Sequence, residues 1–508
     1  MHQDSLSNYF NVRKNQNLLA YFLILTAFFL RLAIILSGQI NLYYDEAQYW
    51  DWSRRLDWSY YSKGPLIAYL IWFWCKIFGP TELGVRFGAC LNFSLSQILI
   101  FKGLQKACEL KNCPHSLLPL VALVISCSTP LFLISGLLMT TDNILVLAYF
   151  IALFCFYFFL QTENNTYLLG MICSLILGIL AKYTMLFFIP LSIVVTYRTK
   201  PALTFKIIWA NIIGGCIGLL PILIWNLKYD WVGLKHVLYR GNLAGQKAFK
   251  LFHLSSFPEF IGGQIGVLTP WYFGLLFWSW FHPSIKKIGN LEYRFCQTFF
   301  WPFWLFFLIL SLHTKVEANW PALAYVPGLV ILAYGFLTLS SNKQKLFLGL
   351  SLLIFILFHL LPFIPLPQKL DVLKRMRGYE QIGKYVYQLK QTQFKNPKQV
   401  FIFSDSYGIS AELAFYTPGK PCVYCVNLGR KQNQYDLWPK PTTTYRDGIF
   451  VTKGIAKNIP LGLKKMFTSL KGPFIFHSTH KGKPGQTVSI ILGYNFTGYW
   501  PSPLEKTF

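Results

Sequence analysis

Two adjacent carboxylates, Asp45 and Glu46, stand in an aromatic-rich segment, NLYYDEAQYWDWSRRLDWSYYSKGPLIAYL, that occupies residues 41–70. Arg54 and Lys63 follow in the same segment. A carboxylate held near a hydroxyl can accept its proton, and cations can neutralise a phosphate whose charge grows as it departs. The segment therefore holds the residue types that a transfer from a phosphate-linked donor requires.

The aromatic residues of this segment suit a helix at a membrane interface, and some could stack on sugar rings. They are Tyr43, Tyr44, Tyr49, Trp50, Trp52, Trp58, Tyr60 and Tyr61. A carboxylate, cations and aromatic side chains in one segment together fit a sugar linked to a lipid phosphate. The alternative is a membrane-surface helix whose charges only face water.

The composition indicates where this segment lies. Of the 508 residues, 54% are hydrophobic and only 13% are charged, about half the charged fraction of soluble proteins. The first apolar run follows Arg13 and Lys14 without a small-residue cleavage site, so we expect an uncleaved signal anchor. Cys422 and Cys425 form a C-x-x-C without the partners that a zinc or redox site needs. The chain is expected to be a polytopic membrane protein.

Apolar runs of spanning length predict about eleven transmembrane helices. They lie near residues 18–37, 84–101, 116–138, 143–160, 167–181, 183–197, 207–226, 261–281, 295–312, 320–339 and 345–364. The run 116–160 is too long for one crossing and should turn at 140-TTDN-143. The run 167–197 is interrupted only by Lys182, which would mark a shallow hairpin.

Positive charge in the short loops predicts a cytoplasmic N-terminus. The loop 227–260 is also basic and would lie outside, against this rule. The orientation places Lys63, Asp142, Lys182 and the loop 313-HTKVEANW-320 on the external face with the opening segment. Ionisable residues at the membrane edge are costly, which favours a functional site there.

The composition changes after residue 367. Residues 371–508 hold 20 Lys and Arg against 7 Asp and Glu. Alternating segments at 399–404, 448–452 and 487–496, with 409–417 between the first two, predict strands and a helix. We expect a transmembrane domain over 1–367, with a catalytic first external loop at 38–83, and a small periplasmic α/β domain over 368–508. The basic surface of this domain suits anionic lipid head groups, and general solubility is the alternative.

With its D-E pair after the first membrane helix, the chain resembles the dolichyl-phosphate-mannose protein mannosyltransferase superfamily, especially the bacterial branch that includes the lipid A aminoarabinose transferase. Nearly the whole chain shares this resemblance. Its further marks are 62-SKGPLIAYL-70, 79-GPTELGVRF-87, 140-TTDN-143, 181-AKYT-184, 225-WNLKYDWVGLKH-236, 263-GQIGVLTP-270, 318-ANWPALAY-325, 403-FSDSYGISAELAFYTPGKP-421 and 434-QYDLW-438. The tail segments have no role that the sequence assigns.

The resemblance implies a GT-C fold with external amphipathic helices, and an inverting transfer from a polyprenyl-phosphate sugar. It also implies roles for single residues. Asp45 matches the catalytic carboxylate, Glu46 would orient it, and Lys63 matches the lysine that meets the donor phosphate. Further phosphate contacts are expected from Arg54 and Lys315. The other residues expected to line the site are Asp142, Lys182, Glu317 and Asn319.

The expected acceptor is lipid A or another glycolipid at the periplasmic side of a bacterial inner membrane. Membrane lipids are expected partners and nucleic acid is not. No cofactor or metal is expected to be required, although a divalent ion at Asp45, Glu46 and Asp142 is conceivable. The alternatives are a lipid-linked sugar flippase or transporter, which should show internal repeats, and a glycan ligase or protein O-glycosyltransferase.

Overall fold

The computed structural model describes residues 2–113, 116–240, 256–367 and 369–502. Residues 241–255, part of the basic loop 227–260 that disagreed with the predicted orientation, lie outside the described residues. The chain divides into two compact units. The first comprises residues 1–33, 63–67 and 87–360, and the second comprises 34–62, 68–86 and 361–508.

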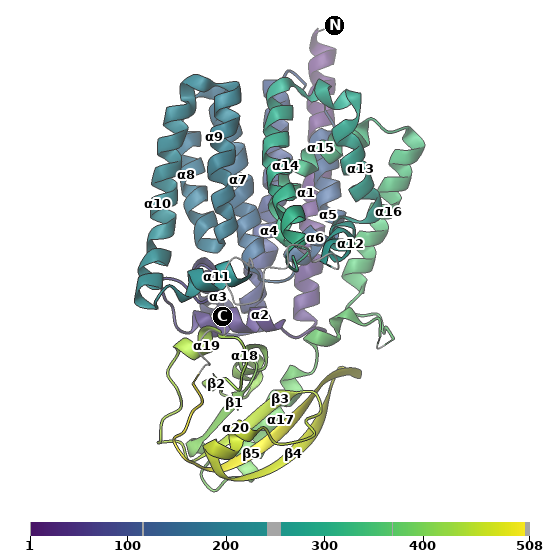
Figure 1. The fold of residues 1–508 in the computed structure, drawn as a ribbon. Coiled ribbons are helices and arrows are strands. Elements are labelled where there is room, and N and C mark those ends of the chain that lie inside the picture. Colours follow the sequence, from purple (N-terminus) through teal and green to yellow (C-terminus); the bar gives the residue numbers. More distant parts are fainter. Residues whose placement is uncertain (1, 114–115, 241–255, 368, 503–508) are drawn as a thin grey trace. The chain divides into compact units, whose positions relative to one another are not determined.

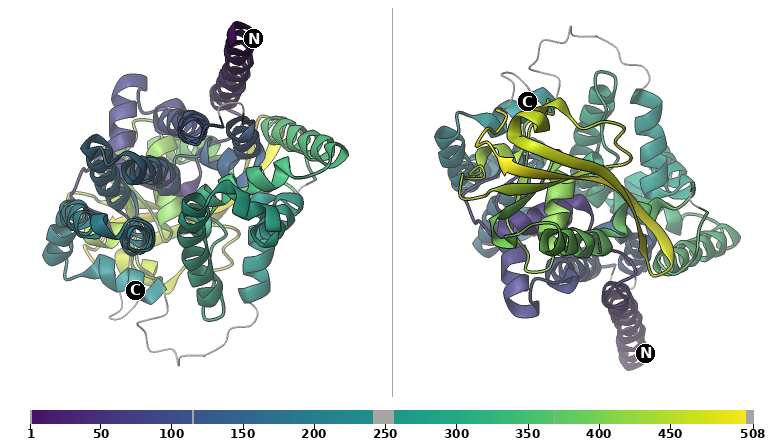
Figure 2. Two further views of the ribbon diagram at one scale, coloured as in Figure 1. Left: turned by 90° about the horizontal axis from the view of Figure 1, so that it is seen from above. Right: turned by 90° about the horizontal axis from the view of Figure 1, so that it is seen from below.

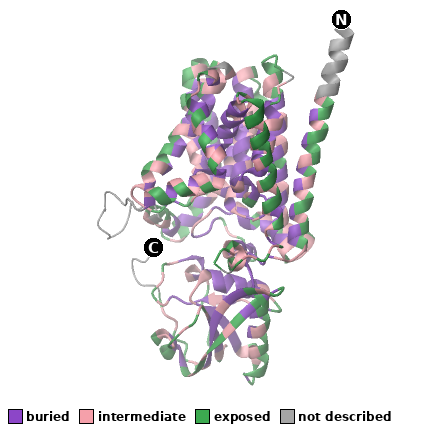
Figure 3. Ribbon diagram, turned by 90° about the vertical axis from the view of Figure 1, so that its right-hand side faces the viewer, coloured by how far each residue is buried: buried purple, intermediate pink, exposed green. Residues whose placement is uncertain are grey.

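The first unit is a bundle of helices (Figure 1). Its elements are α1 (His2–Leu36, whose last three residues belong to the second unit), α4 (Glu82–Leu110, whose residues 82–86 belong to the second unit), α5 (Leu118–Ser128), α6 (Pro130–Ser135), α7 (Thr141–Thr162), α8 (Asn165–Ala181), η1 (Tyr183–Phe187), α9 (Phe188–Thr199), η2 (Pro201–Leu203), α10 (Thr204–Lys228), α11 (Val232–Arg240), α12 (Ser256–Leu268), α13 (Pro270–Phe281), η3 (Pro283–Ile288), α14 (Asn290–Ser311), η4 (Trp320–Leu323), α15 (Tyr325–Leu337) and α16 (Ser341–Leu360). Buried residues fill the interior of this bundle, as Figure 3 shows.

Each predicted span contains helix. Six of the described helices are long and apolar enough to cross a membrane, or seven if the bent pair α12 and α13 counts as one span. Five shorter apolar helices of 10–17 residues accompany them. A helix of that length covers about 15–26 Å, less than the roughly 30 Å hydrocarbon core. The prediction of a helical membrane fold is confirmed, and the count of about eleven crossings stays a prediction.

The predicted breaks occur where the polar residues stand. Helix α7 begins at Thr141 after an extended Thr140, as expected for the turn at 140–143. Lys182 is extended between α8 and η1, which places a break at the predicted position. The structure differs at 261–281, where α12 and α13 bend by 99° at Thr269. The φ of Thr269 is 78°, outside the helical region, and Pro270 disfavours a helical conformation at the residue before it, so the helix breaks there.

The second unit combines the first external loop with the C-terminal domain. Its elements are α2 (Tyr44–Ser53), α3 (Leu66–Phe78, whose first two residues belong to the first unit), η5 (Val372–Met376), α17 (Tyr379–Thr392), η6 (Pro397–Gln399), β1 (Val400–Ser404), α18 (Tyr407–Tyr416), β2 (Val423–Cys425), α19 (Gln434–Leu437), β3 (Asp447–Lys453), α20 (Leu461–Met466), β4 (Phe467–His480) and β5 (Lys483–Phe496). The sequence grouped the loop 38–83 with the helical domain, whereas residues 34–62 and 68–86 share this unit with 361–508.

The predicted α/β domain is present as a five-stranded sheet in the order β2-β1-β3-β5-β4. Strand β1 pairs in parallel with β2 and β3, and β5 pairs antiparallel with β3 and β4. Figure 2 shows the long β4–β5 hairpin at one edge of the sheet. The sequence missed β4 because Gly472 and Pro473 interrupt its pattern, and proline is tolerated mainly on such an edge strand. Phenylalanine side chains of β1, β3 and β4 form the core of the domain.

Candidate functional site

In the first unit, Asp142 joins segments that lie far apart in the sequence. Its Oδ1 accepts from the Lys182 ammonium at 2.6 Å, and its Oδ2 accepts from the Asn319 amide at 2.6 Å. The side chains of Lys182 and Asp142 are 12% and 15% exposed. Lys63 is close enough for its charge to act on Asp142. The structure therefore brings together four of the predicted residues, which we call the Asp142 group: Lys63, Asp142, Lys182 and Asn319.

Local structure explains why Asp142 and Lys182 meet. Asp142 lies in the first turn of α7, where the unpaired backbone N–H groups of a helix start favour a carboxylate. Asn143 fixes this turn, since its amide donates to the carbonyl oxygens of Ser135 at 2.7 Å and Ala89 at 3.1 Å. Sequence analysis gave Asn143 no role, although it quoted the segment that contains it.

A buried network holds the loop that carries Asn319. The Gln264 side chain of α12 donates to the Ala318 carbonyl at 3.2 Å and accepts from the Tyr325 hydroxyl at 2.6 Å. The Trp304 indole donates to the same hydroxyl at 3.1 Å. The segments 263–270 and 318–325, noted only as marks of a resemblance, therefore contact each other and position Asn319.

Lys315 and Glu317 do not join the hydrogen bonds of Asp142. The Lys315 ammonium pairs with Glu259 of α12 at 2.5 Å, and both side chains are more than half exposed. Glu317 is exposed in the same loop. The predicted phosphate contact of Lys315 and the predicted site-lining role of Glu317 stay predictions.

In the second unit, Asp45 and Glu46 have different surroundings. Both Glu46 oxygens accept from Arg86, at 2.9 Å from Nε to Oε1 and 2.6 Å from Nη2 to Oε2, and both side chains are fully buried. The backbone N–H of Tyr43 also donates to Glu46 at 2.9 Å. Asp45 is partly exposed and accepts from the Tyr407 hydroxyl at 3.2 Å. Neighbours on a helix point about 100° apart, so one carboxylate serves the fold and the other is accessible.

Arg54 contacts the C-terminal domain. Its guanidinium donates to the backbone oxygens of Lys420 at 3.0 Å and Pro421 at 3.2 Å, and to Asp51 at 3.2 Å. It also lies over the Trp50 ring, 5.0 Å from its centre. These contacts anchor α2 to the segment after α18, and the predicted phosphate contact of Arg54 stays a prediction.

Sequence analysis missed Arg86 and Tyr407 as partners of the D-E pair. The signal for Arg86 was a lone cation at the start of an apolar run, which is costly unless it is paired. Tyr407 lies in the segment 403–421 that was noted as a mark of the resemblance, but nothing in that segment pointed to Asp45, which stands 362 positions earlier.

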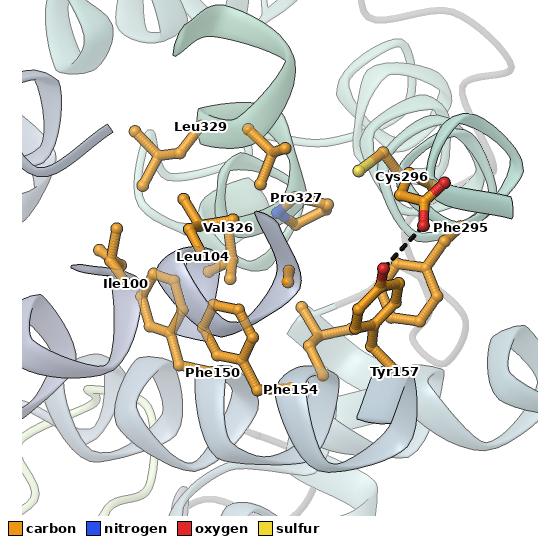
Figure 4. A pocket seen from close by; sticks show the side chains of 14 residues that line it. Ile100, Leu104, Phe150, Phe154, Tyr157, Phe295, Cys296, Val326, Pro327 and Leu329 are labelled. Carbon is orange, nitrogen blue, oxygen red and sulfur yellow. Dashed lines mark hydrogen bonds between the residues drawn. The ribbon is translucent and has the colours of Figure 1, made fainter. Parts of the chain in front are cut away.

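An apolar cavity of about 80 Å³ lies elsewhere in the helical bundle (Figure 4). Residues of α4, α7, α14 and α15 line it, and the Tyr157 hydroxyl donates to Glu292 at 2.7 Å on one side. Its α7 residues begin at Phe150, about 12 Å along the helix from Asp142. The cavity is therefore separate from the Asp142 group. Among the described residues, no three His, Cys, Asp or Glu side chains are arranged to hold a metal ion.

Comparison with known proteins supports the predicted resemblance. The family model "Dolichyl-phosphate-mannose-protein mannosyltransferase" matches residues 62–225, a range that includes Lys63, Asp142 and Lys182. The lipid A galacturonosyltransferase RgtD of Rhizobium johnstonii is 26% identical over 370 residues, which are 70% of this chain and 74% of that protein.

Solved structures resemble the whole chain. ArnT from Cupriavidus metallidurans in the apo state matches with a TM-score of 0.59 at 12% identity, covering 94% of this chain and 98% of ArnT. The same protein bound to undecaprenyl phosphate matches with a TM-score of 0.55 at 13% identity, covering 93% and 97%. The predicted GT-C fold is confirmed.

Gly64 sets the position of Lys63 and gives a test of this geometry. A Cβ at Gly64 would overlap the backbone carbonyl of Leu180, two residues before Lys182. We expect Gly64→Ala to lower the free energy of unfolding by about 1–3 kcal/mol, because backbone atoms must shift to admit the methyl group. Thermal unfolding of the purified chain in detergent measures this. Gly266→Ala is the control, since no atom lies within 4 Å of a Cβ there. Equal melting temperatures for the two variants would contradict the close approach.

Proposed function

We propose that this chain transfers a sugar from a polyprenyl phosphate to lipid A or a related glycolipid. The match of residues 62–225 to the mannosyltransferase family model and the GT-C fold support this proposal. The protein is a membrane glycosyltransferase, as the sequence predicted. The similarity to a lipid A galacturonosyltransferase supports the acceptor, and the fold shared with an ArnT structure that holds undecaprenyl phosphate supports the donor class.

The main support for this proposal is that two lysines, Lys63 and Lys182, lie near one carboxylate, that of Asp142. Both Lys63 and Lys182 lie close enough for their positive charges to act on Asp142. One carboxylate oxygen binds Lys182 and the other binds Asn319, which keeps the lysine in one orientation. Preorganised cations at the end of a membrane helix suit the phosphate of a lipid carrier, in the donor and as it leaves.

The proposed reaction is a displacement at the anomeric carbon. An acceptor oxygen forms a bond to this carbon while the bond from the carbon to the phosphate oxygen breaks, and the configuration inverts. Polyprenyl phosphate leaves as an anion whose charge Lys63 and Lys182 stabilise, with Arg54 and Lys315 proposed as further contacts. A hydroxyl acceptor gives its proton to Asp45. A phosphate acceptor on lipid A is already anionic, and Asp45 then orients it or stabilises positive charge on the sugar ring.

The protein is a multi-pass protein of a bacterial inner membrane, and we propose that its site and its C-terminal domain face the periplasm. The basic short loops at the opposite ends of the predicted helices support this orientation. Lipid A and polyprenyl-phosphate sugars are both amphiphiles, so a membrane-embedded enzyme can take donor and acceptor directly from the bilayer.

Variants of the Asp142 group test the proposal. We expect Lys182→Met and Lys63→Ala each to reduce transfer by about 10²-fold or more, because the departing phosphate loses a preorganised cation. Asp142→Asn should also reduce transfer, since the amide cannot hold Lys182 by charge. Membranes that express each variant are supplied with radiolabelled polyprenyl-phosphate sugars and lipid A, and labelled lipid A is measured.

The matched control is Lys200→Met. Lys200 pairs with Glu163 at 2.9 Å, and both side chains are more than a third exposed, so transfer should stay within about twofold of wild type because such surface pairs contribute little. Lys182→Met with wild-type transfer, at equal membrane insertion, would contradict the proposed role of the Asp142 group.

The proposal includes no metal ion, because Arg86 and the backbone of Tyr43 already engage the Glu46 carboxylate. We therefore expect transfer to continue in excess EDTA at a rate within about twofold of the untreated rate, since phosphate stabilisation comes from lysines. Loss of transfer on chelation, restored by a divalent cation, would show that a metal takes part.

A further inference from the structure

Helix α18 of the C-terminal domain packs closely against α2, the helix that carries Asp45. A Cβ added at Gly408 would lie 2.8 Å from the Cβ of Tyr44, so the two helices approach at a point where only glycine fits. On one side of Gly408, the Tyr407 hydroxyl donates to Asp45 at 3.2 Å. Two turns further along, the Tyr416 hydroxyl accepts from the backbone N–H of Leu42 at 2.7 Å. One face of α18 thus contacts the segment before α2 and its first turn.

A buried cluster lies behind this contact. Besides Glu46, Arg86 donates to the backbone oxygens of Asn41 at 2.8 Å and Ile40 at 3.3 Å. The arginine therefore fixes both the first turn of α2 and the chain that leads into it. Its guanidinium is fully buried, so it depends on these acceptors.

Glu412 of α18 is also fully buried, and neither of its carboxyl oxygens has a hydrogen-bond partner among the described residues. Burial raises the pKa of this carboxyl well above its ordinary value, and the nearby Glu46 raises it further. Burial therefore favours the uncharged form of Glu412. The titratable and charged groups that face it come from α2, α4, α17 and α18 itself: Glu46, Glu82, Arg86, Tyr379 and Tyr416.

The charge state of Glu412 matters for Arg86. An uncharged Glu412 leaves the guanidinium to Glu46, whereas an ionised Glu412 would be a second anion attracting the same cation. Competition for Arg86 would weaken its hold on Glu46 and on the chain before α2, and the position of Asp45 depends on both.

We propose that α18 is the positioning element for the catalytic carboxylate: the Tyr407 hydroxyl orients Asp45, and uncharged Glu412 keeps Arg86 on Glu46 so that α2 stays in place. This inference rests on the proposed function, in which Asp45 acts on the acceptor. It assigns a role to the segment 403–421 of the C-terminal domain. Tyr407 and Glu412 are positioning residues, since both act through Asp45 or the helix that bears it.

The first test compares Tyr407→Phe with Tyr494→Phe. Tyr494 belongs to β5 of the same domain and is not part of α18. We expect Tyr407→Phe to lower kcat about tenfold with KM for both lipids within twofold, because a misdirected Asp45 affects the reaction more than binding. Tyr494→Phe should match wild type. Equal kcat values for the two variants would overturn the role of Tyr407.

The second test uses the isosteric variant Glu412→Gln, with Glu380→Gln on the exposed face of α17 as control. Wild-type transfer should fall at alkaline pH as Glu412 loses its proton, and Glu412→Gln should keep its rate there because the amide cannot ionise. At neutral pH the two should agree within twofold. Glu412→Ala, which leaves a cavity, should lower kcat at every pH. An alkaline limb identical in wild type and Glu412→Gln would overturn the role of Glu412.

A readout independent of activity is hydrogen exchange of the α2 amides in the full-length chain. When folding raises the pKa of a carboxyl, the folded state loses stability as the pH rises above the pKa of that carboxyl in the unfolded chain, about 4.5. Exchange of α2 in wild type, relative to Glu412→Gln, should therefore increase as the pH rises above about 4.5. A constant ratio would overturn the proposal.

Asp45→Asn separates the two proposals. Full transfer by Asp45→Asn would overturn the catalytic role of Asp45, and with it the role of α18 in catalysis. Loss of transfer by Asp45→Asn, with Tyr407→Phe matching Tyr494→Phe and Glu412→Gln showing the alkaline limb of wild type, would overturn only the inference about α18.

Discussion

The ion pair between Arg86 and Glu46 holds the second unit in its functional arrangement. Both side chains are fully buried, and removing two charges from water costs several kcal/mol each. The pair offsets this cost because nearly every donor and acceptor is used. Three hydrogen bonds join the two side chains, and the guanidinium also donates to two backbone carbonyls. The start of α2 is therefore fixed by a contact that tolerates neither a missing partner nor a shifted helix.

The ion pair in the Asp142 group of the first unit differs from the Arg86 pair in its exposure. Its carboxylate also meets a lysine across a sequence separation of 40 residues, but both side chains keep some exposure. One N–H of the Lys182 ammonium is directed at Asp142, and an ammonium has three donors. A lysine with donors beyond the one directed at Asp142 suits a ligand phosphate. The donors of Arg86, in contrast, are directed at Glu46 and at backbone carbonyls, so this pair serves the fold.

The adjacent carboxylates Asp45 and Glu46 have different partners. Asp45 and Glu46 stand together and were predicted to act together, yet Glu46 is committed to Arg86 and Asp45 contacts a tyrosine of the C-terminal domain. Arg54 likewise binds backbone carbonyls after α18. In each case a residue type that is right for chemistry is engaged by the fold. For the buried Glu46 the reason is that a buried charge without partners would cost several kcal/mol.

The sequence by itself determined the helical membrane class, the breaks before Asp142 and at Lys182, and the α/β character of the C-terminal domain. These properties depend on hydropathy over one span, on polar residues in apolar runs and on alternation along a strand, all of which are local. The tertiary structure alone decided which carboxylate meets which cation. The partners stand 40 positions apart for Glu46 and Arg86, 177 for Asp142 and Asn319, and 362 for Asp45 and Tyr407. Such pairings follow from how helices pack at close approaches such as Gly64 and Gly408, and side-chain packing over that separation is not encoded in the pattern of any one segment.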